Sequence, residues 1–256
     1  MATWDPTRYL SFADERSRPF AELLSRVDVK ASRIADLGCG PGHLTPLLRA
    51  RWPNATIEGV DSSSEMIERA IADNEDPDVT YVEADLRDWT AEPPVDLVVS
   101  NAAFQWVPGH LELLPRLSDQ VAPGGIFAFS VPGNFGQPSH RLLDELAATE
   151  PYADHTVDRA KPGSHDASTY LEQFAVRGWD VDAWETTYLH VLQGEDPVYT
   201  WISGTGARPV LQALPDDLRP EFVRRFKAAL RDAYPAHEWG TLLPFRRIFV
   251  VARRSP

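Results

Sequence analysis

The chain of 256 residues contains a single cysteine, only three lysines and no long apolar run. Because Cys39 has no second cysteine to pair with, an intrachain disulfide and a cysteine-rich zinc site are excluded. No segment approaches the roughly 18 consecutive apolar residues that a membrane-spanning helix requires. The first residues also lack the basic and apolar regions of a secretory signal peptide. We therefore expect a cytoplasmic protein with no membrane partner.

Positive charge is scarce as well. The chain has 25 lysines and arginines against 38 aspartates and glutamates, which gives a formal net charge of −13. A field of this sign repels phosphate backbones, so we expect no nucleic-acid partner. It still allows a small anionic substrate, because a pocket can be locally positive. The length fits one large domain whose core needs no disulfides. The sequence does not fix the oligomeric state, and a monomer is our expectation.

Short apolar segments alternate with amphipathic ones in the first half of the chain. The pattern predicts strands at 33–37, 56–60, 79–82, 95–100 and 126–131, and helices at 13–27, 43–51, 66–72 and 110–121. Alternating strands and helices indicate βαβ units. We therefore expect a mostly parallel sheet with helices on both faces and right-handed crossovers.

The second half is less regular. Residues 133–178 show weak periodicity, while 184–191 and 245–252 are typical of strands and 197–234 of a helical segment. This helical segment is inserted between the last two predicted strands. We expect it to lie over the carboxyl edge of the sheet as a lid.

The strongest motif is a glycine loop, Asp-Leu-Gly-Cys-Gly-Pro-Gly at residues 36–42, which directly follows the first predicted strand. Gly38, Gly40 and Gly42 permit tight turns and let a ligand approach the backbone closely. Open α/β sheets bind their ligands at this edge. The loop therefore predicts a ligand site at the end of the first strand.

The loop differs from a dinucleotide fingerprint. That fingerprint needs a third glycine where this chain has His43, and Pro41 has no backbone N–H to offer a pyrophosphate. Asp36 would repel a pyrophosphate but would tolerate an ammonium group. The loop favours a nucleoside with a zwitterionic tail and no phosphate, and S-adenosylmethionine fits this description.

Acidic residues also end the next two predicted strands. Asp61 can accept hydrogen bonds from both ribose hydroxyls. Asp85 can accept one from the adenine amino group, while the backbone N–H of Leu86 serves a ring nitrogen. The predicted cofactor-binding residues are Arg16, Asp36, Gly38, Gly40, Gly42, Asp61, Ser62, Met66, Asp85, Leu86 and Asn101.

With Gly-Val-Asp-Ser-Ser at 59–63 and Glu-Ala-Asp-Leu at 83–86, the glycine loop resembles the class I S-adenosylmethionine-dependent methyltransferases over residues 30–135. The resemblance implies S-adenosyl-L-methionine as cofactor. It also implies an α/β fold: a doubly wound, mostly parallel, seven-stranded Rossmann-like sheet with an antiparallel last strand and a helical lid insertion. We expect a single domain over 1–256, with a cofactor-binding core at 30–135, an N-terminal helical cover at 1–29 and substrate-side insertions at 136–180 and 194–240.

Other segments are similar to the trans-aconitate methyltransferases over nearly the whole chain. They lie at residues 4–9, 12–19, 101–106, 205–209 and 245–254. This resemblance implies methyl transfer to a carboxylate of a small polycarboxylic acid, converting trans-aconitate to its monomethyl ester.

A carboxylate acceptor needs no general base, because a pKa of about 4 leaves it ionised at neutral pH. We therefore predict no catalytic acid or base and no metal, and expect positioning to carry the reaction. Arginines suit the other carboxylates of such a substrate. The predicted substrate-binding residues are Tyr9, Arg16, Trp106, Arg208 and Arg247. Arg16 could hold the carboxylate of the cofactor instead. Arg246 and Arg247 point to opposite faces of a strand, and we favour Arg247.

Three alternatives stay open at this point. The fold could methylate another small-molecule oxygen or carbon acceptor, for which His43 is the one obvious base near a strand end. The chain could bind S-adenosylmethionine without turnover. A nicotinamide oxidoreductase is the third, and the displaced third glycine argues against it.

Overall fold

A computed structural model of the chain describes residues 13–256, with side chains from residue 17 onward. It divides into two compact units. The first, here called the sheet unit, comprises Ala13–Pro132, Ser164–Glu185 and Arg247–Pro256. The second, the helical unit, comprises Gly133–Gly163 and Thr186–Arg246. Strands β6 (Asp180–Leu192) and β8 (Gly240–Arg253) each begin in one unit and end in the other.

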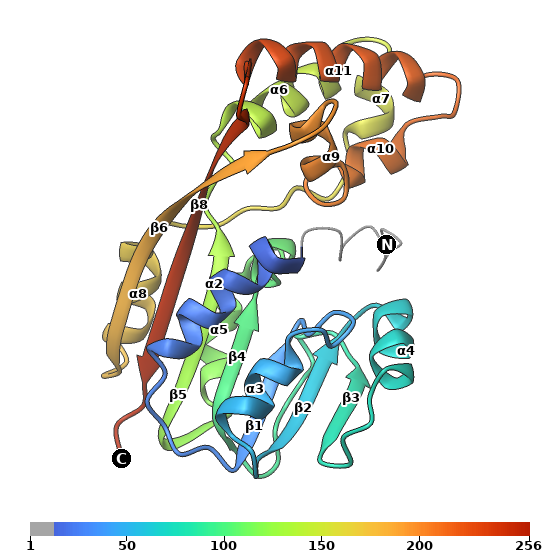
Figure 1. Cartoon of the computed structure of the whole chain (residues 1–256). Coiled ribbons are helices and arrows are strands. Elements are labelled where there is room, and N and C mark those ends of the chain that lie inside the picture. The colour runs from blue at the N-terminus through green and yellow to red at the C-terminus, as the bar shows by residue number, and fades with distance from the viewer. Residues whose placement is uncertain (1–12) are drawn as a thin grey trace. The chain divides into compact units, whose positions relative to one another are not determined.

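The strands form one sheet with the order β3-β2-β1-β4-β5-β8-β6 (Figure 1). Its five N-terminal strands are β1 (Arg33–Leu37), β2 (Thr56–Asp61), β3 (Val79–Glu83), β4 (Val95–Asn101) and β5 (Val121–Pro132). These pair in parallel, whereas β8 runs antiparallel to β5. Within the described residues, the two-residue β7 (Ala236–His237) adds to these seven strands by pairing with β8 off the main path. The predicted mostly parallel sheet with an antiparallel last strand is confirmed.

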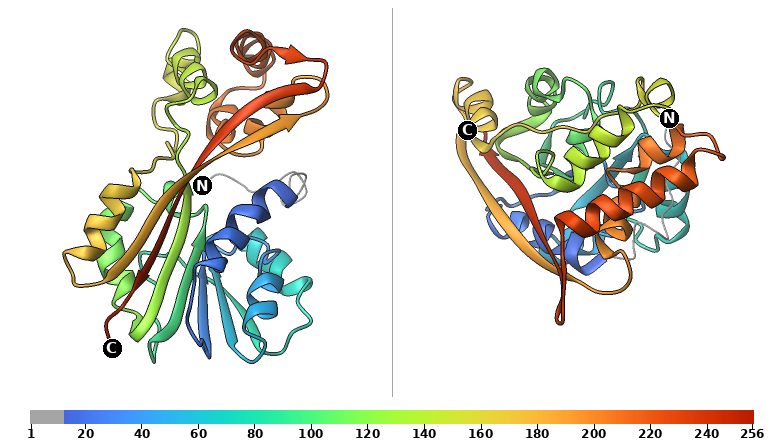
Figure 2. Two further views of the ribbon diagram at one scale, coloured as in Figure 1. Left: turned by 60° about the vertical axis from the view of Figure 1, so that its left-hand side comes forward. Right: turned by 90° about the horizontal axis from the view of Figure 1, so that it is seen from above.

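Helices cover both faces of the sheet unit. Figures 1 and 2 show α2, α3 and α4 on one face, with α5 and α8 on the other. Their bounds are α2 Ala13–Ser25, α3 Thr45–Arg51, α4 Ser64–Ala72, α5 His110–Ser118 and α8 Ala167–Ala175, and the short 3-10 helix η1 spans Phe104–Trp106. The predicted doubly wound arrangement is confirmed, and each predicted helix of this part exists within a few residues of its expected bounds.

Aromatic side chains fill the core of the sheet unit. Phe104, Phe127 and Phe129 are fully buried with Tyr170 and Phe174 of α8. Phe104 meets Phe129 edge to face, with ring centroids 5.3 Å apart. Because both faces of the sheet are covered, β5 is buried continuously from residue 126 to 131 instead of alternating.

The helical unit has its own apolar core. Its helices are α6 (Pro138–Ala147), α7 (Ala153–Thr156), α9 (Pro197–Ser203), α10 (Arg208–Ala213) and α11 (Arg219–Ala233). Phe222, Phe226 and Leu230 lie four residues apart on α11 and are buried in this core. The helical segment expected at 197–234 is present but is divided into three helices, α9, α10 and α11. The weakly periodic residues 133–178, for which no helix was predicted, contain α6, α7 and α8. The placement of the segment 197–234 as a lid stays a prediction.

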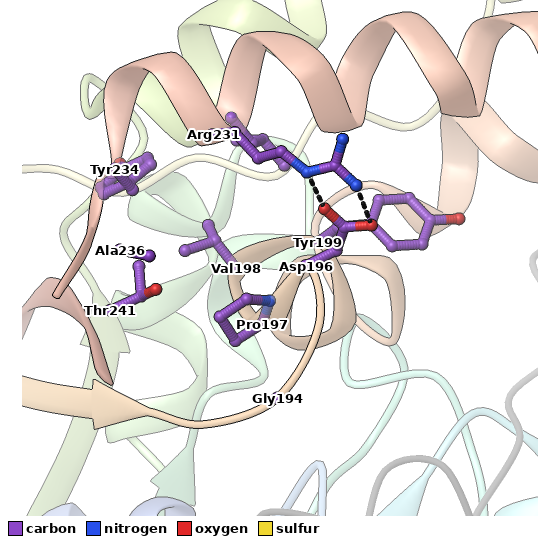
Figure 3. Close-up of a pocket in the computed structure, with 10 residues that line it drawn as sticks. Gly194, Asp196, Pro197, Val198, Tyr199, Arg231, Tyr234, Ala236 and Thr241 are labelled. Carbon is purple, nitrogen blue, oxygen red and sulfur yellow. Dashed lines mark hydrogen bonds and ion pairs between the residues drawn. The ribbon is translucent and has the colours of Figure 1, made fainter. Parts of the chain in front are cut away.

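A cluster of charges joins α9 to α11 in the helical unit. The carboxylate of Asp196 accepts hydrogen bonds from Arg231 Nε at 2.6 Å and Nη2 at 2.9 Å, and Lys227 Nζ lies 3.0 Å from it. Figure 3 shows the pair of Asp196 and Arg231 beside a pocket that is lined in part by Val198 and Tyr234. None of the predicted site residues with a described side chain lines that pocket.

No helix within residues 13–256 combines the length and apolarity that crossing a membrane requires.

Candidate active site

The glycine loop after β1 is held in place by the neighbouring strand. The N–H of Gly38 donates a hydrogen bond to the carbonyl of Val60 at 2.7 Å. Gly38 has a φ of +76°, and a Cβ there would lie 2.1 Å from the Cβ of Ala103. Gly42 has a φ of +74°, and its Cβ would lie 2.5 Å from the hydroxyl oxygen of Tyr81. Both positions therefore require glycine for backbone and space alike.

Gly40 has a different surrounding. Its φ is +57°, but an added Cβ would meet nothing within 4 Å. The chain therefore presents open backbone at this point of the loop, as a ligand that lies against the main chain would require.

Asp61 ties the end of β2 to this loop. Its carboxylate accepts hydrogen bonds from the N–H of Gly40 at 2.9 Å and from that of Ser63 at 3.0 Å. Burial raises the pKa of Asp61, and the hydrogen bonds from these backbone amides oppose the rise. The residue is only half-buried, so its carboxylate has acceptor capacity left for ribose hydroxyls.

Asp36 is the most unusual group of the site. The residue is 3% exposed and lies in β1, one position before Leu37. Burial raises its pKa to about 7, and the charge of Asp61 adds to the rise. Within the described part of the chain no hydrogen bond reaches its carboxylate. A buried carboxylate without a donor is costly, and a cationic ammonium group of a ligand would remove that cost.

The third acidic residue has a partner of its own. Asp85 accepts hydrogen bonds from Arg87 Nε at 2.9 Å and Nη2 at 2.6 Å, and from the backbone N–H of Arg87 at 2.8 Å. The Arg87 side chain therefore lowers the pKa of Asp85. Leu86 is buried beside it, and its carbonyl accepts a hydrogen bond from Arg116. The predicted adenine contacts of Asp85 and Leu86 stay predictions.

The end of β4 contributes polar groups next to the loop. Asn101 is buried, and its side-chain oxygen accepts a hydrogen bond from the hydroxyl of Ser130 at 2.6 Å. The next residue, Ala102, has a φ of +58°, which is uncommon for a residue with a side chain. The chain then turns into η1, where Trp106 is half-buried. This strained turn brings Ala103 against Gly38.

Two further predicted cofactor residues lie at the start of α4. Ser62 is exposed, whereas Met66 is buried on α4. The backbone N–H of Met66 donates to the hydroxyl of Ser63, which caps the helix. Ser62 is thus the residue next to Asp61, and Met66 lies in the first turn of α4. Their contacts with a cofactor stay predictions.

The predicted substrate-binding residues are spread over the chain. Tyr9 lies outside the described residues, and Arg16 lies on α2 with a side chain outside the described part. Arg208, in the helical unit, is 8% exposed, and Arg247, in the sheet unit, is 4% exposed. Both are among the most deeply buried arginines of the described chain, as binding of carboxylates away from water requires. Arg246 is half-buried and donates to the carbonyl of Gly133 at 3.3 Å.

Sequence reasoning missed Tyr81, Ala103 and Ser130, which contact the residues of the site: Tyr81 and Ala103 pack against the glycine loop, and Ser130 donates to Asn101. Tyr81 donates a hydrogen bond to the hydroxyl of Thr45 at 2.9 Å and covers Gly42 and Gly59. Only the alternating pattern of β3 could have indicated that its ring faces the loop. The described side chains contain no group of three or more histidines, cysteines or acids placed to hold a metal ion.

The comparisons with known proteins give the class of this chain. A family model described as "Methyltransferase domain" matches residues 9–183. The chain therefore belongs to the methyltransferase domain family, and the resemblance to methyltransferases that the sequence motifs indicated is confirmed.

Curated relatives narrow this class. The trans-aconitate 2-methyltransferase of Streptomyces avermitilis is 50% identical, over 99% of this chain and 97% of its own length. The protein of that name from Rhodococcus jostii is 49% identical, over 98% of this chain and 99% of its own length. That of Mycobacterium tuberculosis is 48% identical, over 97% and 96%.

Solved structures agree on the fold. The S-adenosylmethionine-dependent methyltransferase of Thiobacillus denitrificans, in complex with S-adenosyl-L-homocysteine, gives a TM-score of 0.54 at 19% identity, covering 98% of this chain and 92% of that chain. A methyltransferase of the same kind from Mesorhizobium loti gives 0.52 at 20% identity, covering 92% and 96%.

Proposed function

We propose that this protein transfers the methyl group of S-adenosylmethionine to a carboxylate of trans-aconitate and thereby forms a monomethyl ester. The observation that carries this proposal is the near-50% identity, over almost the full length of both chains, to relatives named trans-aconitate 2-methyltransferase. The geometry of the glycine loop agrees with it. The loop offers open backbone at Gly40 and, at Asp36, a buried carboxylate that no donor of the described chain reaches.

The residues at the ends of β1 and β2 fit S-adenosylmethionine. Asp36 would receive its ammonium group, Gly40 would lie against its amino-acid tail, and Asp61 would accept hydrogen bonds from its ribose. Asp85, Leu86 and Asn101 are proposed for the adenine end and the rim of the site, with Ser62 and Met66 beside Asp61. When bound, the cofactor supplies an electrophilic methyl group on a positively charged sulfur.

The chain's own task is positioning. A carboxylate acceptor is already ionised at neutral pH, so no residue has to remove a proton. Arg208 and Arg247 are proposed to hold carboxylates of the substrate through charge-assisted hydrogen bonds, together with Tyr9 and Arg16, and Trp106 is proposed as an apolar wall. The attacking oxygen and the methyl carbon must meet at roughly 3–3.5 Å and in line, and a drier site strengthens every charge contact that enforces this.

The test is to incubate the purified protein with S-adenosylmethionine and a panel of acids, and to follow S-adenosylhomocysteine release and product mass. The panel holds trans-aconitate, cis-aconitate and citrate as polycarboxylates, and a set of phenols as the other acceptor class. We expect a monomethyl ester from trans-aconitate with the highest kcat/KM. A methylated phenol with inert trans-aconitate would assign the fold to another acceptor. Binding of S-adenosylmethionine without turnover on any acceptor would indicate a binding module.

The matched variants are Arg208→Gln and Arg247→Gln, each assayed separately. Loss of a charged partner costs about 1.5–3 kcal/mol, so we expect the KM for trans-aconitate to rise roughly tenfold or more while the KM for the cofactor stays constant. Arg219→Gln is the control, because Arg219 is partly exposed and its contacts are to Asp216 and to nearby carbonyls.

We further propose a cytoplasmic monomer that acts without membrane or nucleic acid. The net charge of −13 supports the absence of a nucleic-acid partner. We also propose that residues 1–256 act as one catalytic domain with its cofactor core at 30–135. The passage of β6 and β8 through both compact units supports this view.

A further inference from the structure

Arg208 follows a tightly bonded turn in the helical unit. The N–H groups of Thr205 and Ala207 both donate to the carbonyl of Ile202 at 3.0 Å, and the N–H of Arg208 donates to the carbonyl of Thr205 at 3.1 Å. Pro209 then opens α10 in the first-turn position that suits proline. The backbone position of Arg208 is therefore set by the turn at residues 205–208.

One side of this turn rests on a histidine ring. A Cβ added at Gly206 would lie 2.7 Å from Nε2 and 3.3 Å from Cδ2 of His140. The backbone of Gly206 does not occupy the left-handed region, so the glycine is needed for space and not for conformation. The ring of His140 thus lies directly against the turn that carries Arg208.

His140 is itself firmly held. It lies in the first turn of α6, its Nδ1 is 3.3 Å from the hydroxyl of Ser139, and Phe135 packs edge-on with ring centroids 5.1 Å apart. The N–H of Ser139 donates to the hydroxyl of Tyr234 at 3.0 Å, which ties the start of α6 to the end of α11. Burial lowers the pKa of His140 to about 4, against the opposing effect of Asp144, so the ring is neutral at physiological pH.

We propose that His140 is a positioning residue, whose ring supports the 205–208 turn and thereby places Arg208 for the carboxylate of the substrate. The inference rests on the proposed function and extends it to a residue outside the predicted site. A neutral ring suits this role, because it fixes the turn without adding a second positive charge that would compete with Arg208 for the substrate.

The experiment is a double-mutant cycle on the full chain. His140→Ala removes the support, and Gly206→Ala pushes the ring away from the turn. A misplacement of about 1 Å can cost up to 100-fold in rate, so we expect each variant to raise the KM for trans-aconitate about tenfold and to leave the KM for S-adenosylmethionine unchanged. In the double variant the methyl group added at position 206 occupies space that the ring has vacated, so we expect much of the loss to be recovered.

A second pair of variants separates support from direct contact with substrate. His140→Phe keeps a ring of similar size without the nitrogens, and we expect it to retain a near-normal KM for trans-aconitate. His155→Ala is the control, because this exposed histidine of α7 lies in the same unit. A normal KM in His140→Ala, additive losses in the double variant, or a failure of Phe to replace His would each overturn the proposal.

Unfolding free energies distinguish failure of the proposed function from failure of the role proposed for His140. They are measured for the wild type, the two single variants and the double variant. If the wild-type protein does not methylate trans-aconitate, the proposed function fails on its own. A coupling between positions 140 and 206 in the unfolding free energy would still support the contact that fixes the turn, and its absence would overturn it.

Discussion

Two buried aspartates, one in each compact unit, have opposite surroundings. Asp36 of the sheet unit is 3% exposed, and no hydrogen bond from the described chain reaches its carboxylate. Asp196 of the helical unit is nearly as buried, yet Arg231 and Lys227 neutralise it. Burial raises the pKa of Asp36 to about 7. Burial alone would raise the pKa of Asp196 too, but its hydrogen bonds with Lys227 and Arg231 outweigh this and hold it below its usual value.

The contrast is the one expected between a group that awaits a ligand and a group with a structural role. A buried charge whose partners the fold itself supplies has little hydrogen-bonding capacity left for a ligand, and removing one member of such a pair leaves the other without its partner. A buried carboxylate without a donor destabilises the protein until a cation arrives, and residues of this kind cluster at functional sites. The same substitution, Asp to Asn, should therefore have opposite consequences in the two units.

The largest effect is expected for Asp36→Asn on cofactor binding. A hydrogen bond between charged groups contributes about 1.5–3 kcal/mol, so its loss should weaken binding of S-adenosylmethionine and S-adenosylhomocysteine roughly 50-fold. The ligand-free variant should at the same time unfold at a higher temperature than the wild type, because a costly buried charge is gone.

Titration calorimetry with S-adenosylhomocysteine and a thermal melt measure both quantities. Asp88→Asn, on an exposed residue after β3, is the control. Unchanged affinity would show that Asp36 is an ordinary core residue, and the comparison between the two aspartates would lose its functional meaning.

Asp196→Asn should do the reverse. Asparagine keeps the shape and tolerates the backbone φ of +50° at this position, so only the charge is lost. Because Arg231 and Lys227 are partly exposed and can turn to water, we expect a loss of about 1.5 kcal/mol in unfolding free energy and unchanged cofactor affinity. Urea unfolding gives the value, with Asp216→Asn, on an almost fully exposed partner of Arg219, as the control. A gain in stability would mean that desolvation of the ion pair costs more free energy than the attraction between its charges contributes.

The pH dependence of stability should distinguish the same two residues. Between about pH 4 and pH 7 the folded protein retains a proton on Asp36 that the unfolded chain has released. Its stability therefore falls as the pH rises, by up to about 1.4 kcal/mol per pH unit from this group. The stabilisation by Asp36→Asn should thus grow from about pH 5 to pH 7 and then level off.

For Asp196 the sign is opposite. Its lowered pKa contributes stability that is present above about pH 4 and is lost as the pH falls further. The destabilisation by Asp196→Asn should consequently be constant between about pH 5 and pH 8. Unfolding curves of the wild type and both variants across this range test the pair, and parallel curves for all three proteins would contradict the raised pKa of Asp36.

The sequence predicted the elements of the sheet unit much better than those of the helical unit, because the signals in the sheet unit come from residues close together in the chain. Apolar strands that end in glycine or an acid depend on neighbouring residues only, so β1, β2 and the loop at 36–42 were predictable. In the helical unit, helices begin at or next to Pro138, Pro197, Pro209 and Pro220, and most of them are short. Hydrophobic periodicity that is analysed over the length of a long helix does not detect the breaks between such short helices. Proline in the first turn could nevertheless have indicated where each helix begins.

Tertiary contacts decide the parts of the site that the sequence could not show. The acids at the carboxyl ends of β1, β2 and β3 could be predicted from the sequence as residues that end strands. The burial of Asp36 away from donors of the described chain, and the pairing of Asp85 with Arg87, depend instead on side-chain packing. The same holds for His140, which lies 66 residues before Gly206 in the chain and meets it only in the folded protein.

The smallest effect is expected for Asp85→Asn, because Asp85 is intermediate between the other two aspartates. Asp85 is satisfied like Asp196 but lies at a strand end of the sheet unit like Asp36, and its partner Arg87 is exposed. An exposed ion pair contributes about 0–1 kcal/mol, so stability should change little.

If Asp85 also accepts a hydrogen bond from adenine, the Kd for S-adenosylhomocysteine should rise about fivefold, because the neutral amide oxygen of asparagine accepts a weaker hydrogen bond, by about 1 kcal/mol, than a carboxylate does. Arg87→Gln is the control that removes the ion pair and keeps the carboxylate. Equal affinities for all three proteins would restrict Asp85 to its pair with Arg87, and the recognition of adenine would then rest on the backbone of Leu86.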